Sequence, residues 1–328
     1  MRKFKEIPYH ERKHGTFEEE WLSHRKISEW WYATGYFHDE EEKMYSYQFT
    51  VMRPSIMGFR PFVLHLALTD FASGKHHFIQ RIDRKGKNVL INEKTIQFGK
   101  HAKVVKNETG MHITCENTEF SLDLTLDYGK GAIWHCDNGY LLMGSAKTKE
   151  STSYYSYTNM PTEGTIIFEG KERKIRGKSW FDKQGGPYSL MKAKTHWEWF
   201  SLRFYDDEEI MLFTFPHNNY QDGTYIRKDG STQRLVDYKV IPKDFIVEQE
   251  LKFSSGWTLS IPEIKDSKYD IRPLFKGQMN IGYFEQVCGI YDKTNKQVGI
   301  AIVELLPGVY NKKFKRSFIK NANHFAEK

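Results

Sequence analysis

Cysteine is scarce in this sequence, and its three residues, Cys115, Cys136 and Cys288, are far apart. They form no CxxC pair, and an odd number at irregular spacing does not make a disulfide framework. The sequence therefore predicts a protein of a reducing compartment, the cytoplasm, whose stability comes from a core rather than from disulfides.

Long apolar runs are also missing. No segment approaches the roughly 18 apolar residues that a membrane-spanning helix requires. The first fifteen residues, MRKFKEIPYHERKHG, contain no apolar stretch typical of a signal peptide. We expect no membrane span and no secretory leader.

Patterns that hold cofactors, metal ions or nucleic acids are equally absent. There is no glycine-rich phosphate loop and no G-x-S-x-G nucleophile motif. Neighbouring pairs such as His76-His77 and His135-Cys136 would point to opposite faces of a strand, so neither pair can chelate one ion. The 49 Lys and Arg exceed the 42 Asp and Glu by 7, and this basic excess is spread along the chain without a nucleic-acid motif. We predict no metal ion, no cofactor and no nucleic-acid partner.

Aromatic residues are abundant, with 23 Phe, 19 Tyr and 8 Trp. Long amphipathic helical patterns are rare, and segments that alternate with a period of two are common, for example 31–37, 44–53, 62–69 and 120–126. Glycine-containing turns separate them. This pattern predicts an all-β sandwich or barrel, with one short helix around Phe17–His24.

An internal repeat indicates two similar domains. Three short segments occur twice at a constant offset of 168 residues: Trp31-Tyr32 matches Trp199-Phe200, Tyr36-Phe37 matches Phe204-Tyr205, and Asp39-Glu40-Glu41 matches Asp207-Glu208-Glu209. The connection that follows is four residues shorter in the second copy. A period this long favours two related domains over a solenoid. We predict a lead-in at 1–28, a first domain at 29–190 and a second at 191–328, ending in a basic tail, Asn311–Lys328.

At these motifs the sequence resembles the carotenoid 1,2-hydratase/AttH-like family, whose members have two lipocalin-like domains. The stretches that carry the resemblance are Glu29–Tyr36, Tyr47–Thr50 with Arg53, His65–Asp70, Tyr154–Thr158, Thr162–Thr165, Gly177–Asp182, Trp197–Leu202 and Glu304-Leu305. Their co-linear order covers roughly 25–310. The resemblance implies an all-β chain of two lipocalin-like antiparallel β-barrels in tandem, with few short helices.

The chain departs from the family pattern W-[FM]-D-H-x-W-G at the end of the first domain. Here the segment reads Trp180-Phe181-Asp182-Lys183-Gln184-Gly185-Gly186. The aspartate is kept, but Lys183 replaces the histidine and Gly185 replaces the second tryptophan. Family activities include hydration of an isoprenoid double bond, and related two-barrel proteins direct cyclisation of polyketide-derived chains. Membership therefore implies a pocket for a large apolar ligand.

Asp182 is the best candidate for catalysis. Hydration of an alkene begins with protonation of carbon, and a carboxyl in an apolar pocket resists ionisation and can remain a proton donor. Trp180, Tyr155, Tyr157 and Trp31 could stabilise the developing cation through their ring faces. Asp182 could instead cap the turn that follows it. A widened site at Gly185 is a further expectation.

Each of the other candidates also has a structural alternative. His135 could carry a proton near neutral pH, or lie in a loop. His65 could face a ligand from a strand, or be a core histidine. Gln48 and Arg53 could bind the polar end of a ligand, and a buried ion pair between Arg53 and Glu29 is an alternative for the latter.

Three functions remain open from the sequence. The leading hypothesis is a cofactor-independent hydratase-like or isomerase/cyclase-like enzyme for an apolar isoprenoid or polyketide-type substrate. The second is a non-catalytic carrier of a hydrophobic small molecule. The third is a structural protein without a cavity above about 300 Å³.

Overall fold

The computed structural model describes residues 3–55, 59–145, 150–189, 196–264 and 267–311. The chain forms two compact units: Met1–Trp134 with Glu150–Ser189, and His135–Lys149 with Leu190–Lys328. No helix among the described residues is long and apolar enough to cross a membrane. The predicted basic tail, apart from Asn311, lies outside the described residues. The predicted domain limits stay a prediction, and the segment 135–149 groups with the second unit.

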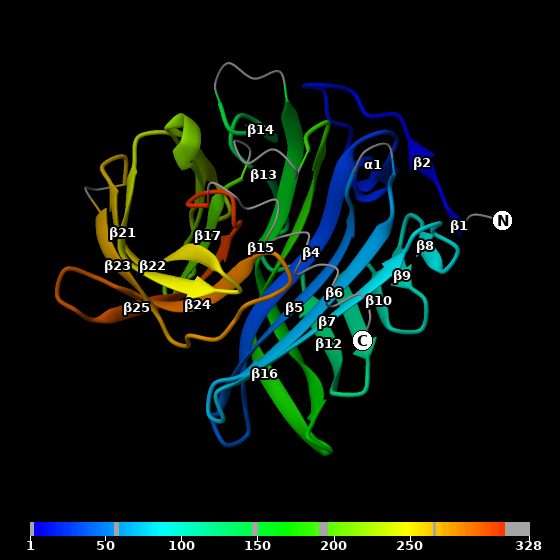
Figure 1. Cartoon of the computed structure of the whole chain (residues 1–328), viewed down its shortest axis with the longest axis horizontal. Helices are drawn as coiled ribbons and strands as arrows, with labels where there is room; N and C mark the ends of the chain where they lie inside the picture. Colours follow the sequence, from blue (N-terminus) through cyan, green and yellow to red (C-terminus); the bar gives the residue numbers. More distant parts are fainter. Residues whose placement is uncertain (1–2, 56–58, 146–149, 190–195, 265–266, 312–328) are drawn as a thin grey trace. The chain divides into compact units, whose positions relative to one another are not determined.

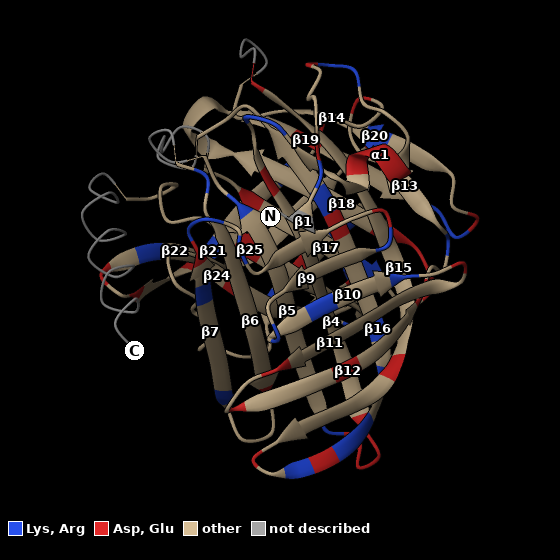
Figure 2. Ribbon diagram, turned by 90° about the vertical axis from the view of Figure 1, so that its right-hand side faces the viewer, with Lys and Arg blue, Asp and Glu red and all other residues tan. Residues whose placement is uncertain are grey.

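The first unit consists of one large, almost entirely antiparallel sheet that curls around its core (Figures 1 and 2), together with a separate parallel pair formed by Glu6–Ile7 and Ser23–His24. Its strands are β1 (Lys3–Phe4), β2 (Glu6–Ile7), β3 (Ser23–His24), β4 (Ser28–Asp39), β5 (Met44–Arg53), β6 (Phe62–Asp70), β7 (Lys75–Asp83), β8 (Val89–Ile91), β9 (Thr95–Phe98), β10 (Ala102–Lys106), β11 (Gly110–Glu116), β12 (Phe120–Asp127), β13 (Ala132–Trp134), β15 (Ser151–Phe168) and β16 (Lys171–Gly186). The main order is β1-β8-β9-β10-β11-β12-β15-β16-β4-β5-β6-β7. Strands near both ends of this order contribute to one core, because Val89 and Ile91 of β8 cluster with Leu64 of β6.

The alternating sequence of β12 shows why the sheet has one apolar face. In FSLDLTLD, Phe120, Leu122, Leu124 and Leu126 are buried, while Asp123, Thr125 and Asp127 are exposed. A strand directs successive side chains to opposite faces, so this pattern places the leucines in the core.

The helix α1 (Phe17–Trp21) confirms the predicted short helix and begins at a capping box. The Thr16 hydroxyl accepts the amide N–H of Glu19, and the Glu19 carboxylate accepts the N–H of Thr16. The helix ends earlier than predicted because Leu22 is extended and 23–24 form β3. Its Trp21 is fully buried in the core of the first unit.

The second unit is an antiparallel sheet of nine described strands in the order β20-β19-β18-β17-β25-β24-β23-β22-β21. The strands are β17 (Glu198–Phe204), β18 (Glu209–Phe215), β19 (Tyr220–Ile226), β20 (Thr232–Leu235), β21 (Lys239–Glu248), β22 (Leu251–Ile261), β23 (Ser267–Pro273), β24 (Phe284–Tyr291) and β25 (Gln297–Leu305); β14 (Tyr140–Leu142) and a 3₁₀ turn at Pro216–Asn218 also belong to its residues. Its own core includes Phe200, Trp257 and Phe284. The predicted all-β, lipocalin-like fold is confirmed.

The repeated hairpins occupy equivalent places in the two sheets. β4 lies between β5 and the last strand β16, and β17 lies between β18 and the last strand β25. The offset of 168 is nevertheless wrong, because Trp31 belongs to the first core whereas Phe200, not Trp199, belongs to the second. A slip by an odd number of residues exchanges the two faces of a strand, and the true offset differs from 168 by three residues.

The turns of the two hairpins give the corrected alignment. In each turn the N–H of the first residue bonds to the fifth residue's carbonyl: Asp39 to Lys43 at 3.0 Å and Phe204 to Glu208 at 2.9 Å. Their left-handed residues are Glu42 (φ 59°) and Asp207 (φ 67°). The acidic residues that match in sequence therefore occupy different turn positions.

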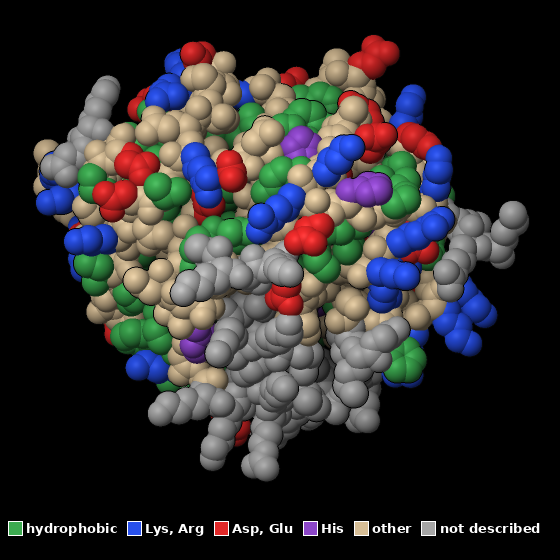
Figure 3. Space-filling view, turned by 90° about the horizontal axis from the view of Figure 1, so that it is seen from above, with side chains coloured by type: hydrophobic (Ala, Val, Ile, Leu, Met, Phe, Trp, Pro, Cys, Tyr) green, Lys and Arg blue, Asp and Glu red, His purple; other side chains and the backbone are tan. Residues whose placement is uncertain are grey.

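Acidic and basic side chains are intermixed on the part of the described surface that Figure 3 shows. Figure 3 shows both signs scattered over the face seen from above, without a large area of one sign. This agrees with a net charge of +7 that is distributed along the chain.

Candidate functional site

Asp182 lies on the sheet face opposite the core of the first unit. It is in β16, directly opposite Ser156 of β15 and Tyr32 of β4. It is 4% exposed, and its Oδ1 accepts hydrogen bonds from the Trp180 indole at 2.6 Å, from the Tyr154 phenol at 3.2 Å and from the Ser156 hydroxyl. Asp182 is therefore a strand residue held by three neutral donors, and not a turn cap.

Lys183 points to the other face of the same strand. Its Nζ lies 2.8 Å from Glu29 Oε2 and 4.3 Å from the ring centroid of Trp31. An ion pair between Lys183 and Asp182 would oppose acid catalysis, because it favours the ionised carboxylate. Alternation along β16 separates the two side chains, and Lys183 pairs with Glu29 instead.

Glu29 is the centre of a buried charge network inside the first unit. Its carboxylate also accepts the Ser23 hydroxyl at 2.6 Å and the His24 N–H at 3.0 Å. Burial alone would raise the pKa of Glu29, but the charge of Lys183 and the contacts with His24 outweigh it and lower the pKa to about 2. Burial likewise opposes protonation of His24, yet Glu20 and Glu29 raise its pKa.

Arg53 belongs to this network rather than to the Asp182 face. Its guanidinium donates to Glu6 Oε1 at 2.6 Å and to the Ser23 hydroxyl at 2.9 Å. It also lies 4.9 Å from the ring centroid of Phe4 and 4.8 Å from that of Phe62. The alternative of a buried ion pair therefore describes Arg53, although its partner is Glu6 and not Glu29.

Two other predicted binding residues share the face of Asp182. Gln48 donates to the Thr50 hydroxyl at 2.9 Å, and Thr50 lies opposite both Tyr32 and His65. His65 lies 2.9 Å from Gln80 Oε1, and burial lowers its pKa to about 4 despite that contact. His65 is therefore a neutral imidazole at neutral pH.

The aromatic residues predicted around the site divide between the two faces. Trp180 contacts Asp182. The side chains of Trp31, Tyr155 and Tyr157 point to the opposite face. There the ring centroids of Tyr155 and Phe17 are 5.1 Å apart. From the sequence motif Tyr154–Thr158, Tyr155 and Tyr157 were predicted to bind the substrate. The strand register instead brings Tyr154 and Ser156 to Asp182, and only knowledge of that register could have selected them.

His135 is grouped with the second unit. Its side chain is fully buried, and burial lowers its pKa to about 3. A proton carrier that titrates near neutral pH is therefore not what the structure provides at this position.

Gly185 does not widen the site. A Cβ atom at this position would lie 2.8 Å from Glu29 Cβ and 2.9 Å from Ile27 Cδ1. Gly185 is also opposite Glu29, on the face away from Asp182. The expectation of extra room is wrong because Ile27 and Glu29 already fill that space.

One histidine spacing was missed in the sequence. His10 and His14 are four residues apart, as in a helical metal site. The segment is not helical, and His14 stacks on Trp134 with ring centroids 3.7 Å apart. Among the described residues, no group of three or more His, Cys, Asp or Glu could hold a metal ion.

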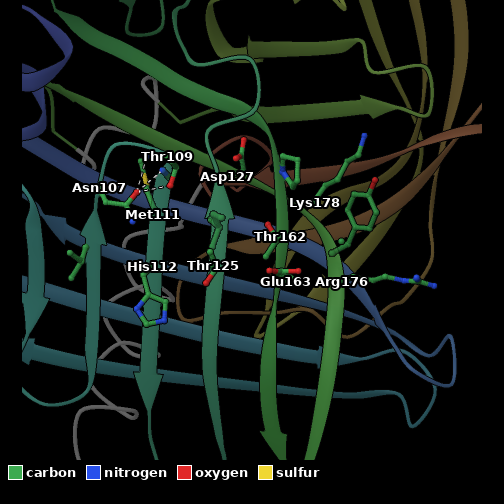
Figure 4. A pocket seen from close by; sticks show the side chains of 16 residues that line it. Asn107, Thr109, Met111, His112, Thr125, Asp127, Thr162, Glu163, Arg176 and Lys178 are labelled. Atoms are coloured by element: carbon green, nitrogen blue, oxygen red, sulfur yellow. Dashed lines mark hydrogen bonds between the residues drawn. The ribbon is translucent and has the colours of Figure 1, made fainter.

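An open cavity of about 1040 Å³ lies in the first unit (Figure 4). His112, Thr125, Glu163 and Arg176 form one row along its wall, because each is paired with the next across β11, β12, β15 and β16. None of the predicted catalytic or binding residues lines it. Its volume exceeds the roughly 300 Å³ that a small-molecule pocket requires.

Comparison with known proteins supports the sequence resemblance. The sequence profile of the AttH-like family matches residues 8–308. This chain belongs to the AttH-like family. A search of curated proteins finds no match.

Three solved structures share the fold. An AttH protein from Nitrosomonas europaea has 20% identity and a TM-score of 0.81 over 92% of this chain and 100% of that one. Kievitone hydratase from Nectria haematococca has 14% identity and a TM-score of 0.69 over 85% of this chain and 88% of that one. CghA, solved with Sch210972, has 9% identity and a TM-score of 0.53 over 87% of this chain and 89% of that one.

Proposed function

We propose that this AttH-like protein is a cofactor-independent hydratase-like or cyclase-like enzyme that acts by proton donation on a large apolar substrate of isoprenoid or polyketide type. The observation that supports this proposal most is the buried carboxyl group of Asp182, which accepts hydrogen bonds from Trp180 and Tyr154 on one face of the sheet. The hydratase name of one structural neighbour supports the reaction class. The cytoplasm is the compartment we propose for it.

Three neutral groups position the carboxyl group of Asp182. Trp180, Tyr154 and Ser156 all donate to Oδ1. In the proposed reaction the carboxyl group transfers its proton to one carbon of the substrate double bond. The ring faces of Trp180 and Tyr154 stabilise the cation, each by about 0.5–2 kcal/mol.

The cation then has two outcomes. In hydration, water adds to it and Asp182 takes back one proton, so one molecule of water is consumed. In isomerisation the cation loses a neighbouring proton to Asp182. In cyclisation a second double bond attacks the cation, and the new cation that results then loses a proton to Asp182. Both outcomes regenerate the acid without net consumption of water. Lys183 takes no part in either outcome, because it is held by Glu29 on the other face. His135 and the inward-facing Trp31, Tyr155, Tyr157 and Arg53 remain predictions outside this mechanism.

Substitution of Asp182 by asparagine tests the proposal. The protein purified from its own host is first examined by native mass spectrometry for a retained apolar molecule, which then serves as substrate. We expect Asp182→Asn to abolish turnover and to change ligand affinity by less than about tenfold, since it removes the proton and keeps the shape. Thr50→Ser, a mild change on the same face, is the control. Unchanged turnover in Asp182→Asn would reject the catalytic role.

A non-catalytic carrier is the second candidate, and the cavity of Figure 4 favours it. That cavity of about 1040 Å³ is large enough for a hydrophobic molecule and contains neither Asp182 nor His135. Thr125→Trp would fill its middle. If the protein is a carrier, Thr125→Trp should no longer retain the ligand, whereas Asp182→Asn should retain it as the parent does. No variant should then show turnover.

A further inference from the structure

The open cavity of the first unit contains a carboxylate that the protein leaves without a partner. Glu163 of β15 lies directly opposite Arg176 of β16, an arrangement that favours an ion pair. Arg176 donates instead to Glu42 at 2.8 Å, and the Glu163 carboxylate forms no hydrogen bond or ion pair with the described part of the chain. The same holds for the hydroxyl of Thr125, which lies opposite Glu163 on its other side. A hydroxyl, a carboxylate and a guanidinium therefore follow one another across the cavity (Figure 4).

The ion pair that holds Arg176 is open to exchange. Both of its side chains are largely exposed, Arg176 at 80% and Glu42 at 67%. An exposed ion pair contributes little stability, because water screens it and two long side chains must be ordered. A guanidinium also has five N–H donors, so Arg176 can donate to a ligand without first losing Glu42.

A second row of lining residues lies parallel to the polar row and offers apolar surface. Pro161, Lys178 and Tyr36 are opposite one another on β15, β16 and β4. Pro161 is two residues from Glu163 along β15, so the two rows face the same side of the sheet. A pyrrolidine ring, the aliphatic part of a lysine side chain and a phenol ring therefore lie next to the polar row.

The charges that line the cavity balance one another. Asp127 and Glu163 supply two carboxylates, and Arg176 and Lys178 supply two cations. An ion that is attracted by one pair would be repelled by the other, so the lining favours a neutral ligand. The cavity of about 1040 Å³ extends across the adjacent strands β11, β12, β15 and β16, so the ligand that it suits is long.

We propose that this cavity binds a neutral oligosaccharide. A sugar ring carries hydroxyl groups around its edge and C–H groups on its faces. Because a hydroxyl group both donates and accepts, neighbouring hydroxyl groups donate to the Glu163 carboxylate and accept from the Arg176 guanidinium. The C–H faces cover the rings of Pro161 and Tyr36. This binding goes beyond the proposed enzymatic function, and it differs from the carrier candidate, which places an apolar molecule in the same cavity.

Calorimetric titration of the full-length protein tests the class of ligand. The probes are cellohexaose, maltohexaose and xylohexaose, which are neutral chains of different linkage or ring type, and hexagalacturonate, which carries a carboxylate on every ring. We expect a dissociation constant below about 1 mM for at least one neutral chain, and weaker binding of hexagalacturonate. Absence of binding by all three neutral chains up to about 10 mM, or tighter binding of hexagalacturonate than of each neutral chain, would overturn the proposal.

Variants of the full-length protein locate the binding. Glu163→Ala removes the central acceptor, and the neutral chain that binds the parent most tightly should bind it at least about tenfold more weakly. Thr125→Trp fills the cavity and should abolish binding. The control is Glu172→Ala, which removes an exposed carboxylate of β16 outside the cavity and should change the dissociation constant by less than about twofold. Equal binding by Glu163→Ala and the parent, or an equal loss in Glu172→Ala, would overturn the proposal.

A neutral apolar probe distinguishes the oligosaccharide from the ligand of a hydrophobic carrier. N-Phenyl-1-naphthylamine fluoresces strongly in apolar surroundings, and its fluorescence is measured with the parent and with Thr125→Trp. We expect equal fluorescence with the two proteins, although Thr125→Trp no longer binds the neutral chain. Fluorescence that is lost in Thr125→Trp would assign the cavity to an apolar molecule and would contradict the proposal.

Discussion

Asp182 and Lys183 are neighbours in the sequence, yet they lie in different chemical surroundings. Asp182 is bound by neutral donors on one face of β16, and Lys183 is bound by a carboxylate and a tryptophan ring on the other. The lysine that replaces the family's histidine therefore has a structural role inside the barrel. Its partner Glu29 is fully buried, so the pair cannot be separated without leaving a buried charge.

Removal of the lysine charge tests this role. Lys183→Met removes the nearest cation from the buried carboxylate of Glu29, which keeps only the longer contacts with His24 at 3.4 Å and Arg60 at 3.7 Å. We expect the free energy of unfolding to fall by about 3–5 kcal/mol. The double variant Lys183→Met, Glu29→Gln removes both charges and should recover more than half of that loss. Urea unfolding measures both values. A single variant as stable as the parent would show that the pair contributes nothing to stability.

The depressed pKa of Glu29 predicts a specific dependence of stability on pH. The folded-state pKa of about 2 lies below the ordinary value of 4.5, so this group stabilises the fold fully above about pH 5 and progressively less as the pH falls towards 2. We expect the loss of unfolding free energy between pH 5 and pH 3 to be smaller in Glu29→Gln than in the parent. Equal losses in the two proteins would contradict the assigned ionisation of Glu29.

At the scale of the element, the register between β15 and β16 decides which residues surround Asp182. Ser156 is opposite Asp182, and Tyr155 is opposite Lys183. The sequence could predict strands here from aromatic alternation, and could select Asp182 from its motif. It could not select Tyr154 over Tyr155, because the face that each occupies depends on a pairing that no local pattern specifies.

The two neighbouring tyrosines give a matched pair of variants. Tyr154→Phe removes a donor to Asp182, and we expect turnover to fall about tenfold, the effect of losing roughly one hydrogen bond. Tyr155→Phe removes a hydroxyl on the opposite face and should change turnover by less than about twofold. Steady-state kinetics with the identified substrate measures both. The reverse order of effects would place the reaction on the inner face.

At the scale of the whole molecule, the repeat predicted two related sheets, and the order of strands confirms equivalent hairpins. The exact alignment was wrong because sequence matching followed the acidic residues, whereas the fold is determined by which aromatics reach the core: Trp31 in one unit and Phe200 in the other. The polar row of the cavity, with Glu163 and Arg176, also escaped prediction, because it is brought together by the pairing of β15 with β16.

The central claim, that Asp182 delivers a proton to carbon, is tested most directly by isotope transfer from the solvent. Asp182 exchanges its proton with D₂O, so a reaction that it starts places deuterium on a carbon of the product, whether the outcome is hydration, isomerisation or cyclisation. The protein is incubated in D₂O with the apolar fraction of its own host, and the products are analysed by mass spectrometry and NMR. We predict a carbon-bound deuterium in a product formed by the parent protein and none with Asp182→Asn. Carbon-bound deuterium formed equally by both proteins, or a product without it, would contradict the account.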